Sequence, residues 1–298
     1  MTMLIIIKPS TNKNHKKVCD WLLHECNQRQ ISTEIIYTTG NFHPDCKKIT
    51  QRAEYYQRAV VVGGDGTLNL AVNALVGLSC SLALLPLGTG NDFSRGFGCS
   101  DKEWRTAVFS QGDVKIDVGQ INDRYFVNIA GVGFDAHVVK ALQTKPARSS
   151  LGYSLAGFKY LLGYKGTHIT SDFSGREYAY KNLITVFANH RYFGGGLAIA
   201  PKARLNSGYL ECYAMPARGL LGNLYSFMRL LLRNHHTMAG LEYQRVTVAT
   251  INTPNLPIEA DGELIGVTPA SIQVHPRALR FCVPTCTSIQ LEIKKVCS

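Results

Sequence analysis

Two glycine-rich turns with hydroxyl and amide side chains are the first candidates for chemistry in this sequence. They read GGDGT at 63–67 and PLGTGND at 86–92, and each follows a short apolar run and precedes a stretch with helical spacing. Glycines there let the backbone approach a phosphate, and the following helix offers N–H donors and a partial positive charge. Alternatively, these are tight turns in which Asp65 and Thr67 merely cap helices. Two such turns in consecutive strand–turn–helix units favour a nucleotide site.

Asp65 is the unusual member of the first turn, because its negative charge would repel a phosphate. An aspartate makes sense there if it engages Mg²⁺, a ribose or the amides of a loop. The common nucleotide fingerprints are absent. The chain has no G-x-x-x-x-G-K-[ST] motif and no protein-kinase motif set, and GGDGTL does not fit the dinucleotide G-x-G-x-x-G pattern.

A third candidate is the acidic stretch LPIEADGELIG at 256–266, near the end of an expected strand. Phosphoryl transfer needs positioning, charge neutralisation and a carboxylate that orients and deprotonates the attacking hydroxyl. In a strand Glu259 and Asp261 would share one face, but only Asp261 and Glu263 lie at the turn. Because Asp-Gly is a strong turn signal, a polar hairpin tip remains an equal alternative from the residues alone.

The elements that must position these residues change in character along the chain. Up to about residue 92, short apolar strands near 3–8, 32–39, 58–62 and 80–87 alternate with helical stretches near 15–29 and 44–56. That alternation predicts a parallel sheet with helices on both faces, with ligands at the carboxyl ends of its strands. From about residue 113, strand-like pieces broken by Gly, Pro and Asn are typical of an antiparallel sandwich or barrel, and we expect a sandwich. We expect an α/β domain over 1–118, joined by 285–298, and a β-rich domain over 119–284.

The bulk composition limits the partners. In 298 residues, 45% are hydrophobic and 18% charged, as in a soluble globular protein. A net charge of +11 favours anionic partners, but the basic residues are scattered and no nucleic-acid-binding motif is present, so we expect no nucleic acid. The chain shows no signal-peptide core and no transmembrane segment, and its nine cysteines fit a reducing compartment, so we expect a cytoplasmic protein.

Five sequence blocks carry a resemblance to a known family. GGDGTLN at 63–69 and PLGTGNDFSR at 86–95 resemble the diacylglycerol kinase catalytic family, which includes bacterial lipid kinases and sphingosine kinases. FVNIAGVGFDA at 126–136, NHRYFGGGLAIAPKA at 189–203 and IEADGE at 258–263 are similar to later blocks of that family, in the same order. The resemblance implies a nucleotide-binding α/β domain and a β-rich domain, with ATP and Mg²⁺ in a cleft between them.

The resemblance also implies roles for individual residues. Asp261 and Glu263 match the catalytic acidic pair, with Glu263 as the proton acceptor. The positions that match nucleotide contacts are Thr39, Gly64, Asp65, Gly66, Thr67, Leu68, Asn69 and Thr89. Arg204, Ser207 and Tyr209 match a structural Mg²⁺ site, but Ser207 stands where the family has an aspartate. A serine hydroxyl replaces a carboxylate poorly, so we expect that site to be weakened or absent.

A second departure from the family lies after the first strand. The chain reads KPSTNKN at 8–14, with Lys8 in place of an asparagine and no glycine after it. Elsewhere, RGLLGNLYSFMRLLLRNHH at 218–236 is a basic amphipathic stretch. It fits a helix lying on an anionic membrane and equally a helix packed on the β-rich domain with exposed arginines.

We therefore expect an ATP- and Mg²⁺-dependent lipid kinase that transfers the γ-phosphate to a lipid hydroxyl, with diacylglycerol or a related lipid as acceptor. The protein would contact the membrane peripherally. The sequence leaves open whether it forms a homodimer. The alternatives are a kinase for a soluble hydroxyl, NAD in particular, and a non-catalytic lipid- or nucleotide-binding protein, which the altered KPS turn and Ser207 would favour.

Overall fold

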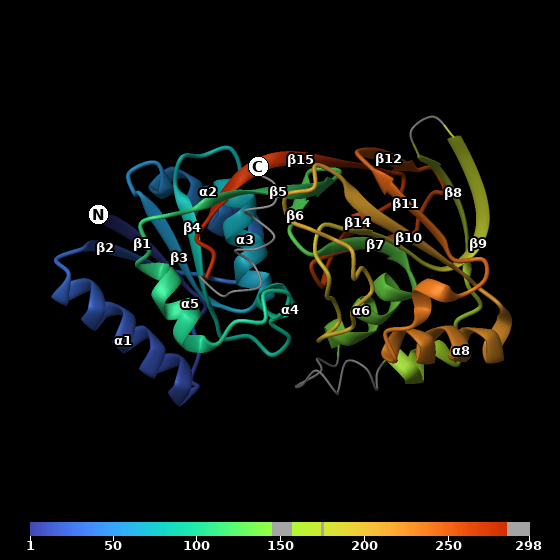
Figure 1. Ribbon diagram of the computed structural model, residues 1–298, viewed down its shortest axis with the longest axis horizontal. Helices are drawn as coiled ribbons and strands as arrows, with labels where there is room; N and C mark the ends of the chain where they lie inside the picture. The colour runs from blue at the N-terminus through green and yellow to red at the C-terminus, as the bar shows by residue number, and fades with distance from the viewer. Residues whose placement is uncertain (145–156, 174–175, 285–298) are drawn as a thin grey trace. The chain divides into compact units, whose positions relative to one another are not determined.

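The computed structural model describes residues 1–144, 157–173 and 176–284 of the chain (Figure 1). Two compact units are present. The first comprises Met1–Ile116 and the described residues from Arg277 onward, and the second comprises Asp117–Pro276. The chain passes from one unit to the other within β5 (Val114–Ile121) and returns within β15 (Ala270–Phe281). The expected return of residues 285–298 to the first domain lies outside the described residues.

The first unit is built on a parallel sheet. Its strand order is β2 (Ser32–Tyr37), β1 (Thr2–Ile7), β3 (Arg58–Gly63), β4 (Ser81–Pro86), and the end of β15 pairs with β4 in parallel. All six residues of β3 are buried, as expected for a central strand covered on both faces. The α/β prediction for this part of the chain is confirmed.

Helices lie on both faces of this sheet. α1 (Lys13–Gln28) and the end of α5 (Asp101–Val108) pack on the face that carries Ile5 and Val60. α3 (Asp65–Leu75) contacts β1, β3 and β4, and α2 (Phe42–Ala53) packs against α3. The short α4 (Asp92–Arg95) follows the second glycine-rich turn.

The second unit is an antiparallel β structure with helices on one side, so the β-sandwich prediction is also confirmed. The strand order is β14-β13-β7-β9-β8-β12-β15, while β10 pairs with β9 and β11, and β5 pairs with β15 and β6. The bounds of the strands not yet given are β6 (Arg124–Phe126), β7 (Ile129–Gly133), β8 (Thr167–Phe173), β9 (Arg176–Ala188), β10 (Leu210–Pro216), β11 (Glu242–Val246), β12 (Val248–Ile251), β13 (Pro257–Ala260) and β14 (Glu263–Val267).

Two apolar clusters lie on opposite faces of β7. Ala130 and Val132 belong to a cluster between the strands of the unit, which also holds Ile258 of β13. Ile129 belongs to the other cluster, which is covered by α6 (Phe134–Thr144), the helical residues 157–161 and α8 (Gly219–Leu231). The 3₁₀ turn η1 (His235–Thr237) follows α8. Among the described residues, no helix is long and apolar enough to cross a bilayer.

Candidate active site

The first glycine-rich turn joins β3 to α3 and lies in backbone contact with the second turn. Gly64 is the N-cap of α3, and its carbonyl accepts the Leu68 N–H at 3.0 Å. A Cβ added at Gly64 would lie 2.7 Å from the Cα of Gly88. The Leu87 N–H also donates to the Gly63 carbonyl at 2.8 Å. The glycines are therefore needed because two loops meet backbone to backbone, whatever ligand they bind.

Asp65 ties the two turns together through its side chain. Its carboxylate oxygens accept the N–H groups of Asp92 at 3.1 Å and Phe93 at 3.2 Å, at the start of α4. Burial raises the pKa of Asp65, while the bonds from the Phe93 and Asp92 amides lower it. Of the three partners that the sequence allowed for this aspartate, loop amides are the one that the structure shows.

The second turn is held by Asn91, which adopts a left-handed conformation with φ of 50°. Its side-chain oxygen accepts the Gly88 N–H at 2.7 Å, so the asparagine closes the turn on itself. The exposed Thr89 lies between these two residues. The turn therefore presents a threonine and its own backbone to solvent.

The predicted nucleotide contacts share one edge of the first sheet. Gly63 is the parallel partner of Pro86, and Ile7 is the partner of both Tyr37 and Val62, so the strands end side by side. Both turns begin at that carboxyl edge. Such edges are where open α/β sheets bind ligands.

Not every predicted side chain reaches solvent at this edge. Gly66 and Thr89 are exposed, whereas Thr67, Leu68 and Asn69 are buried within the first unit. Thr39 lies two residues past β2, and its hydroxyl donates to the Asp45 carboxylate at 3.0 Å. The roles of these residues as nucleotide contacts remain predictions.

The altered turn after β1 forms without glycine. The Asn12 side chain caps α1 by accepting the Asn14 N–H at 2.8 Å, and the Ser10 hydroxyl accepts the Asn12 N–H at 3.2 Å. Lys8, the first residue after β1, is exposed at the same carboxyl edge. A cation therefore replaces the asparagine that the family has there.

In the second unit, the acidic stretch forms the β13–β14 hairpin with Asp261 and Gly262 at its turn. Both residues have positive φ, 48° and 84°, as a two-residue hairpin loop requires. The Asp261 carboxylate accepts three backbone N–H groups, from Val127 at 3.0 Å, Asn128 at 2.8 Å and Ile129 at 3.2 Å. Asp261 therefore fastens the hairpin to the segment that precedes β7.

Glu263 has a different environment. Its carboxylate forms an ion pair with Arg124 at 2.7 Å, and 44% of the Glu263 side chain is exposed, against 12% for Arg124. A neighbouring guanidinium favours the ionised carboxylate that a general base requires. Arg124 was not among the predicted residues. It is 139 positions away in sequence, and only the fold of β6 and β14 brings it to Glu263.

The residues matched to a structural Mg²⁺ site do not fit that ion. The Ser207 hydroxyl lies 3.1 Å from the Arg204 carbonyl and 2.9 Å from the Tyr209 carbonyl, and its one proton can be donated to either. The hydroxyl thus lies against both carbonyls that would serve as ligands, and the three residues supply no negative charge. Within the described part of the chain, no group of three or more His, Cys, Asp or Glu residues is arranged to hold a metal.

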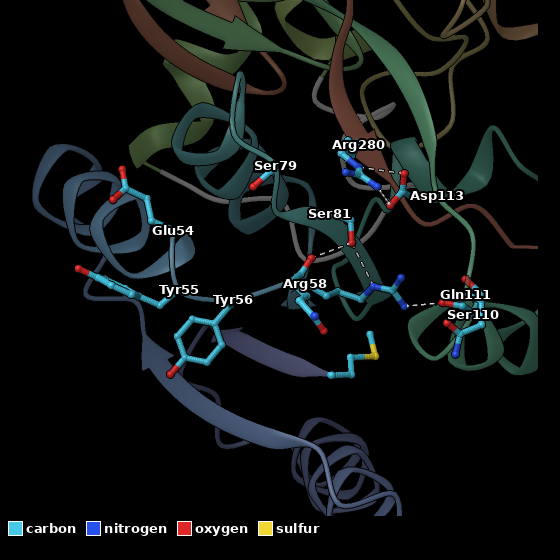
Figure 2. Close-up of a pocket in the computed structure, with 12 residues that line it drawn as sticks. Glu54, Tyr55, Tyr56, Arg58, Ser79, Ser81, Ser110, Gln111, Asp113 and Arg280 are labelled. Atoms are coloured by element: carbon cyan, nitrogen blue, oxygen red, sulfur yellow. Dashed lines mark hydrogen bonds and ion pairs between the residues drawn. The ribbon is translucent and has the colours of Figure 1, made fainter.

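A cavity of about 660 Å³ lies at the opposite, amino end of the first sheet (Figure 2). The buried Arg58 lines it and donates to the carbonyls of Val108 at 2.6 Å and Ser110 at 2.9 Å. Val108 ends α5, where a cation offsets the helix dipole. Arg280 and Asp113 form an ion pair on the cavity wall. The buried Arg58 therefore stabilises the C-terminal end of α5. None of the predicted site residues lines this cavity.

The fold and the site together define a class of protein. Its members have two domains, with paired glycine turns on a parallel sheet and an acidic hairpin on a β-sandwich. Comparison with known proteins gives the family. Residues 2–121 match the family described as diacylglycerol kinase catalytic domain, and residues 128–283 match the YegS C-terminal NAD kinase beta sandwich-like domain. The chain belongs to the family of bacterial lipid-kinase and diacylglycerol-kinase-like proteins, which confirms the resemblance seen in the sequence.

Individual relatives agree along most of the chain. A Shewanella frigidimarina protein named "Probable lipid kinase YegS-like" is 30% identical, over 78% of each chain. A Bacillus subtilis diacylglycerol kinase is 26% identical over 97% of this chain and 98% of its own. The crystal structure of a Bacillus anthracis diacylglycerol kinase superposes with a TM-score of 0.75 at 19% identity, covering 97% and 98% of the two chains. That structure supports the fold.

Proposed function

We propose that this protein is a lipid kinase that transfers the γ-phosphate of MgATP to a lipid hydroxyl, with diacylglycerol or a closely related lipid as the acceptor. One observation carries the proposal. In the acidic hairpin, the side chain of Glu263 is 44% exposed and paired with Arg124, whereas the carboxylate of Asp261 accepts three backbone N–H groups. Membership of a kinase family supports the same reaction class.

The proposal assigns MgATP to the first unit. Phosphate oxygens would lie against the N-terminus of α3 and the exposed backbone of Gly66, with Thr89 of the second turn as a further donor. Lys8, at the same edge, would supply positive charge to the phosphates, whereas the carboxylate of Asp65 is negative. Asp65 acts indirectly, because it holds the second turn against the first. Mg²⁺ arrives with ATP as part of the substrate.

The proposal assigns proton removal to Glu263. An ionised carboxylate beside Arg124 would accept the proton of the lipid hydroxyl as its oxygen bonds to the γ-phosphorus and the bond to the β–γ bridging oxygen breaks, releasing ADP. Asp261 is a positioning residue in this account, since its oxygens already accept the N–H groups of Val127, Asn128 and Ile129. The two carboxylates of the predicted pair thus have separate roles.

Helix α8 supports a lipid surface as the partner. Phe227 and Leu230 pack it onto the second unit, yet the helix and the residue after it also expose apolar side chains. The exposed ones are Leu220, Leu221, Tyr225, Met228, Leu231 and Leu232. No Asp or Glu occurs from residue 212 to 241, while Arg218, Arg229 and Arg233 lie in that stretch. An apolar face with arginines and no carboxylates is suited to an anionic bilayer, where we propose the protein acts peripherally from the cytoplasm.

The test of the reaction is an acceptor panel. Purified protein is incubated with γ-labelled ATP, Mg²⁺ and either diacylglycerol in mixed micelles or NAD. The proposal expects label in the organic phase, and label on NAD would instead identify the soluble-substrate alternative. ATP binding without transfer to any acceptor would identify a non-catalytic protein.

The test of the surface is sedimentation with vesicles of phosphatidylcholine alone or with phosphatidylglycerol. Leu221→Glu and Leu232→Glu should each lower binding to the anionic vesicles, because each places a negative charge on the exposed apolar face. Leu221 is 81% exposed and Leu232 is 68% exposed. The matched control is Val267→Glu, at a 56% exposed apolar position on β14. Equal loss in the control, or no binding by the wild type, would refute α8 as the contact.

A further inference from the structure

Asn189 is a polar residue in the interior of the second unit. It follows β9 directly and is 0% exposed. Its side-chain Nδ2 donates two hydrogen bonds, to the Asp117 carbonyl at 2.9 Å and to the Val127 carbonyl at 3.1 Å. Its Oδ1 is buried and has no hydrogen-bond partner among the described residues. An unpaired buried oxygen is costly, so the contribution of this side chain lies in its two N–H groups.

The chemistry of its neighbours fixes the orientation of this amide. Both groups that Nδ2 contacts are carbonyl oxygens, which can only accept hydrogen bonds. An apolar side chain at position 189 would leave the two carbonyls without these donors, and a carboxylate would repel them. Position 189 therefore requires a double donor.

The amide of Asn189 bridges two chains that separate at this point. The pairing of β5 with β6 runs from Ile121 and Arg124 to Gly119 and Phe126. The two carbonyls that Asn189 binds lie just beyond that pairing, one on β5 and the other on the residue after β6. The side chain thus holds the start of the segment 127–129 against β5.

The segment 127–129 is bonded from two sides. The backbone N–H groups of Asn189 and His190 donate to the Asn128 carbonyl at 2.8 and 3.0 Å. The three N–H groups of the segment donate to the Asp261 carboxylate, and the Asp261 N–H donates back to the last carbonyl of the segment at 2.9 Å. The segment therefore lies as a bonded layer between Asn189 and Asp261.

The catalytic turn, formed by Asp261 and Gly262 and followed by Glu263, depends on this layer in two ways. The carboxylate of Asp261 is held by the N–H groups of the segment. Arg124, which pairs with Glu263 at 2.7 Å, lies on β6 three residues before Val127. A shift of the segment would displace both the anchor of the turn and the partner of the base.

We propose that Asn189 is a positioning residue for phosphoryl transfer, because it fixes the segment 127–129 and thereby the turn that carries Glu263. Asn189 itself contacts neither ATP nor lipid in this account. A general base must lie within hydrogen-bond reach of the proton that it removes, and a small displacement lowers kcat. This inference rests on the proposed role of Glu263.

The first experiment measures kcat and KM for Asn189→Ala, which removes both side-chain donors and keeps the backbone bonds. We expect kcat for diacylglycerol phosphorylation to fall about tenfold or more. The KM for ATP should change little, because the predicted nucleotide contacts lie in the first unit.

The matched control is Asn182→Ala on the same strand. Asn182 is also buried, at 4% exposure, and its Nδ2 donates to the Thr185 hydroxyl at 2.9 Å. It lies about 23 Å from Asn189 along an extended chain, so its loss should leave kcat unchanged. Unchanged kcat in Asn189→Ala would overturn the proposal. An equal fall in both variants would also overturn it, because general destabilisation would then explain the effect.

The second experiment needs no activity. Hydrogen exchange of the peptides that span 127–129 and 261–263 should become about tenfold faster in Asn189→Ala and stay unchanged in Asn182→Ala. If Asn189→Ala does not fold, native-state exchange of the wild type decides. The amides of 127–129 and of 189–190 should then open together, with one free energy, because they belong to one bonded layer. Amides at 127–129 that open well before those at 189–190 would overturn the proposal.

The two readouts separate the two proposals. Faster exchange at 127–129 and 261–263 in Asn189→Ala, in a protein that transfers no phosphate, would preserve the role of Asn189 in holding the turn and refute the kinase assignment. Phosphoryl transfer with equal kcat and equal exchange in wild type and Asn189→Ala would refute the positioning role and leave the kinase assignment standing.

Discussion

The substitution Asp261→Asn separates anchoring of the catalytic turn from catalysis. Asparagine tolerates the left-handed conformation that Asp261 adopts, with φ of 48°, so the backbone is not strained. Oδ1 can still accept the N–H groups of Asn128 and Ile129 at 2.8 and 3.2 Å. The new amide N–H₂, however, faces the Val127 N–H, which now donates to Oδ2 at 3.0 Å.

One charge-assisted bond is thus lost and one donor is left without an acceptor, at a cost of about 1.5–3 kcal/mol. At 1.36 kcal/mol per decade, local opening becomes roughly 10- to 150-fold more frequent. Hydrogen exchange of the peptide that spans Val127–Ile129 measures this directly. Glu263→Gln is the matched control, since its side chain is 44% exposed and its carboxylate pairs with the Arg124 side chain.

The expected result is faster exchange in Asp261→Asn and unchanged exchange in Glu263→Gln, with kcat lowered in both. Unchanged protection at Val127 in Asp261→Asn, together with a loss of activity, would show that the carboxylate of Asp261 does not anchor the turn. The division of roles between the two acidic residues would then be wrong.

Three further predictions test other parts of the structure. Gly64→Ala should weaken ATP binding about tenfold or more by calorimetry, because its Cβ would meet Gly88 Cα at 2.7 Å, whereas Gly112→Ala, with open space, should not. Ser207→Asp should make the melting temperature rise by about 5 °C with saturating Mg²⁺, while the wild type shifts by less than about 1 °C; equal shifts would contradict the loss of that site. Asp135→Asn should gain stability relative to wild type as pH rises from 4 to 7, by up to about 4 kcal/mol in urea unfolding. The reason is that burial raises the pKa of Asp135 from 3.8 to about 7, so between these pH values the folded wild type retains a proton that the unfolded chain releases. A difference in unfolding free energy between the two proteins that stays constant with pH would contradict the raised pKa.

Much of the first unit could be predicted from sequence, because its signals are local. Apolar strands followed by glycine turns and amphipathic helices indicated a parallel sheet with both turns at its carboxyl edge, and the register of Gly63 with Pro86 bears this out. The contact between Gly64 and Gly88 could not be predicted, since it depends on how closely two strands end side by side. For the same reason, the sequence left the partner of Asp65 open among three choices.

The acidic hairpin shows a sharper limit. Asp-Gly indicated the turn, and the resemblance indicated the acidic pair with Glu263 as proton acceptor, but neither showed what holds Asp261 in place or which residue pairs with Glu263. Their difference comes from partners distant in sequence, which are the amides at 127–129 for Asp261 and Arg124 for Glu263.

The central claim is that Glu263 removes the proton from a lipid hydroxyl as ATP phosphorylates it. The most direct measurement is single-turnover transfer from γ-labelled ATP to diacylglycerol in micelles, with the product resolved by chromatography, for wild type and Glu263→Gln. The account predicts a phosphorylated lipid with the wild type and a rate on the order of 10²-fold or more lower with Glu263→Gln, at equal ATP binding. Equal rates in the two proteins, or no phosphorylated lipid from a wild type that binds ATP, would contradict it.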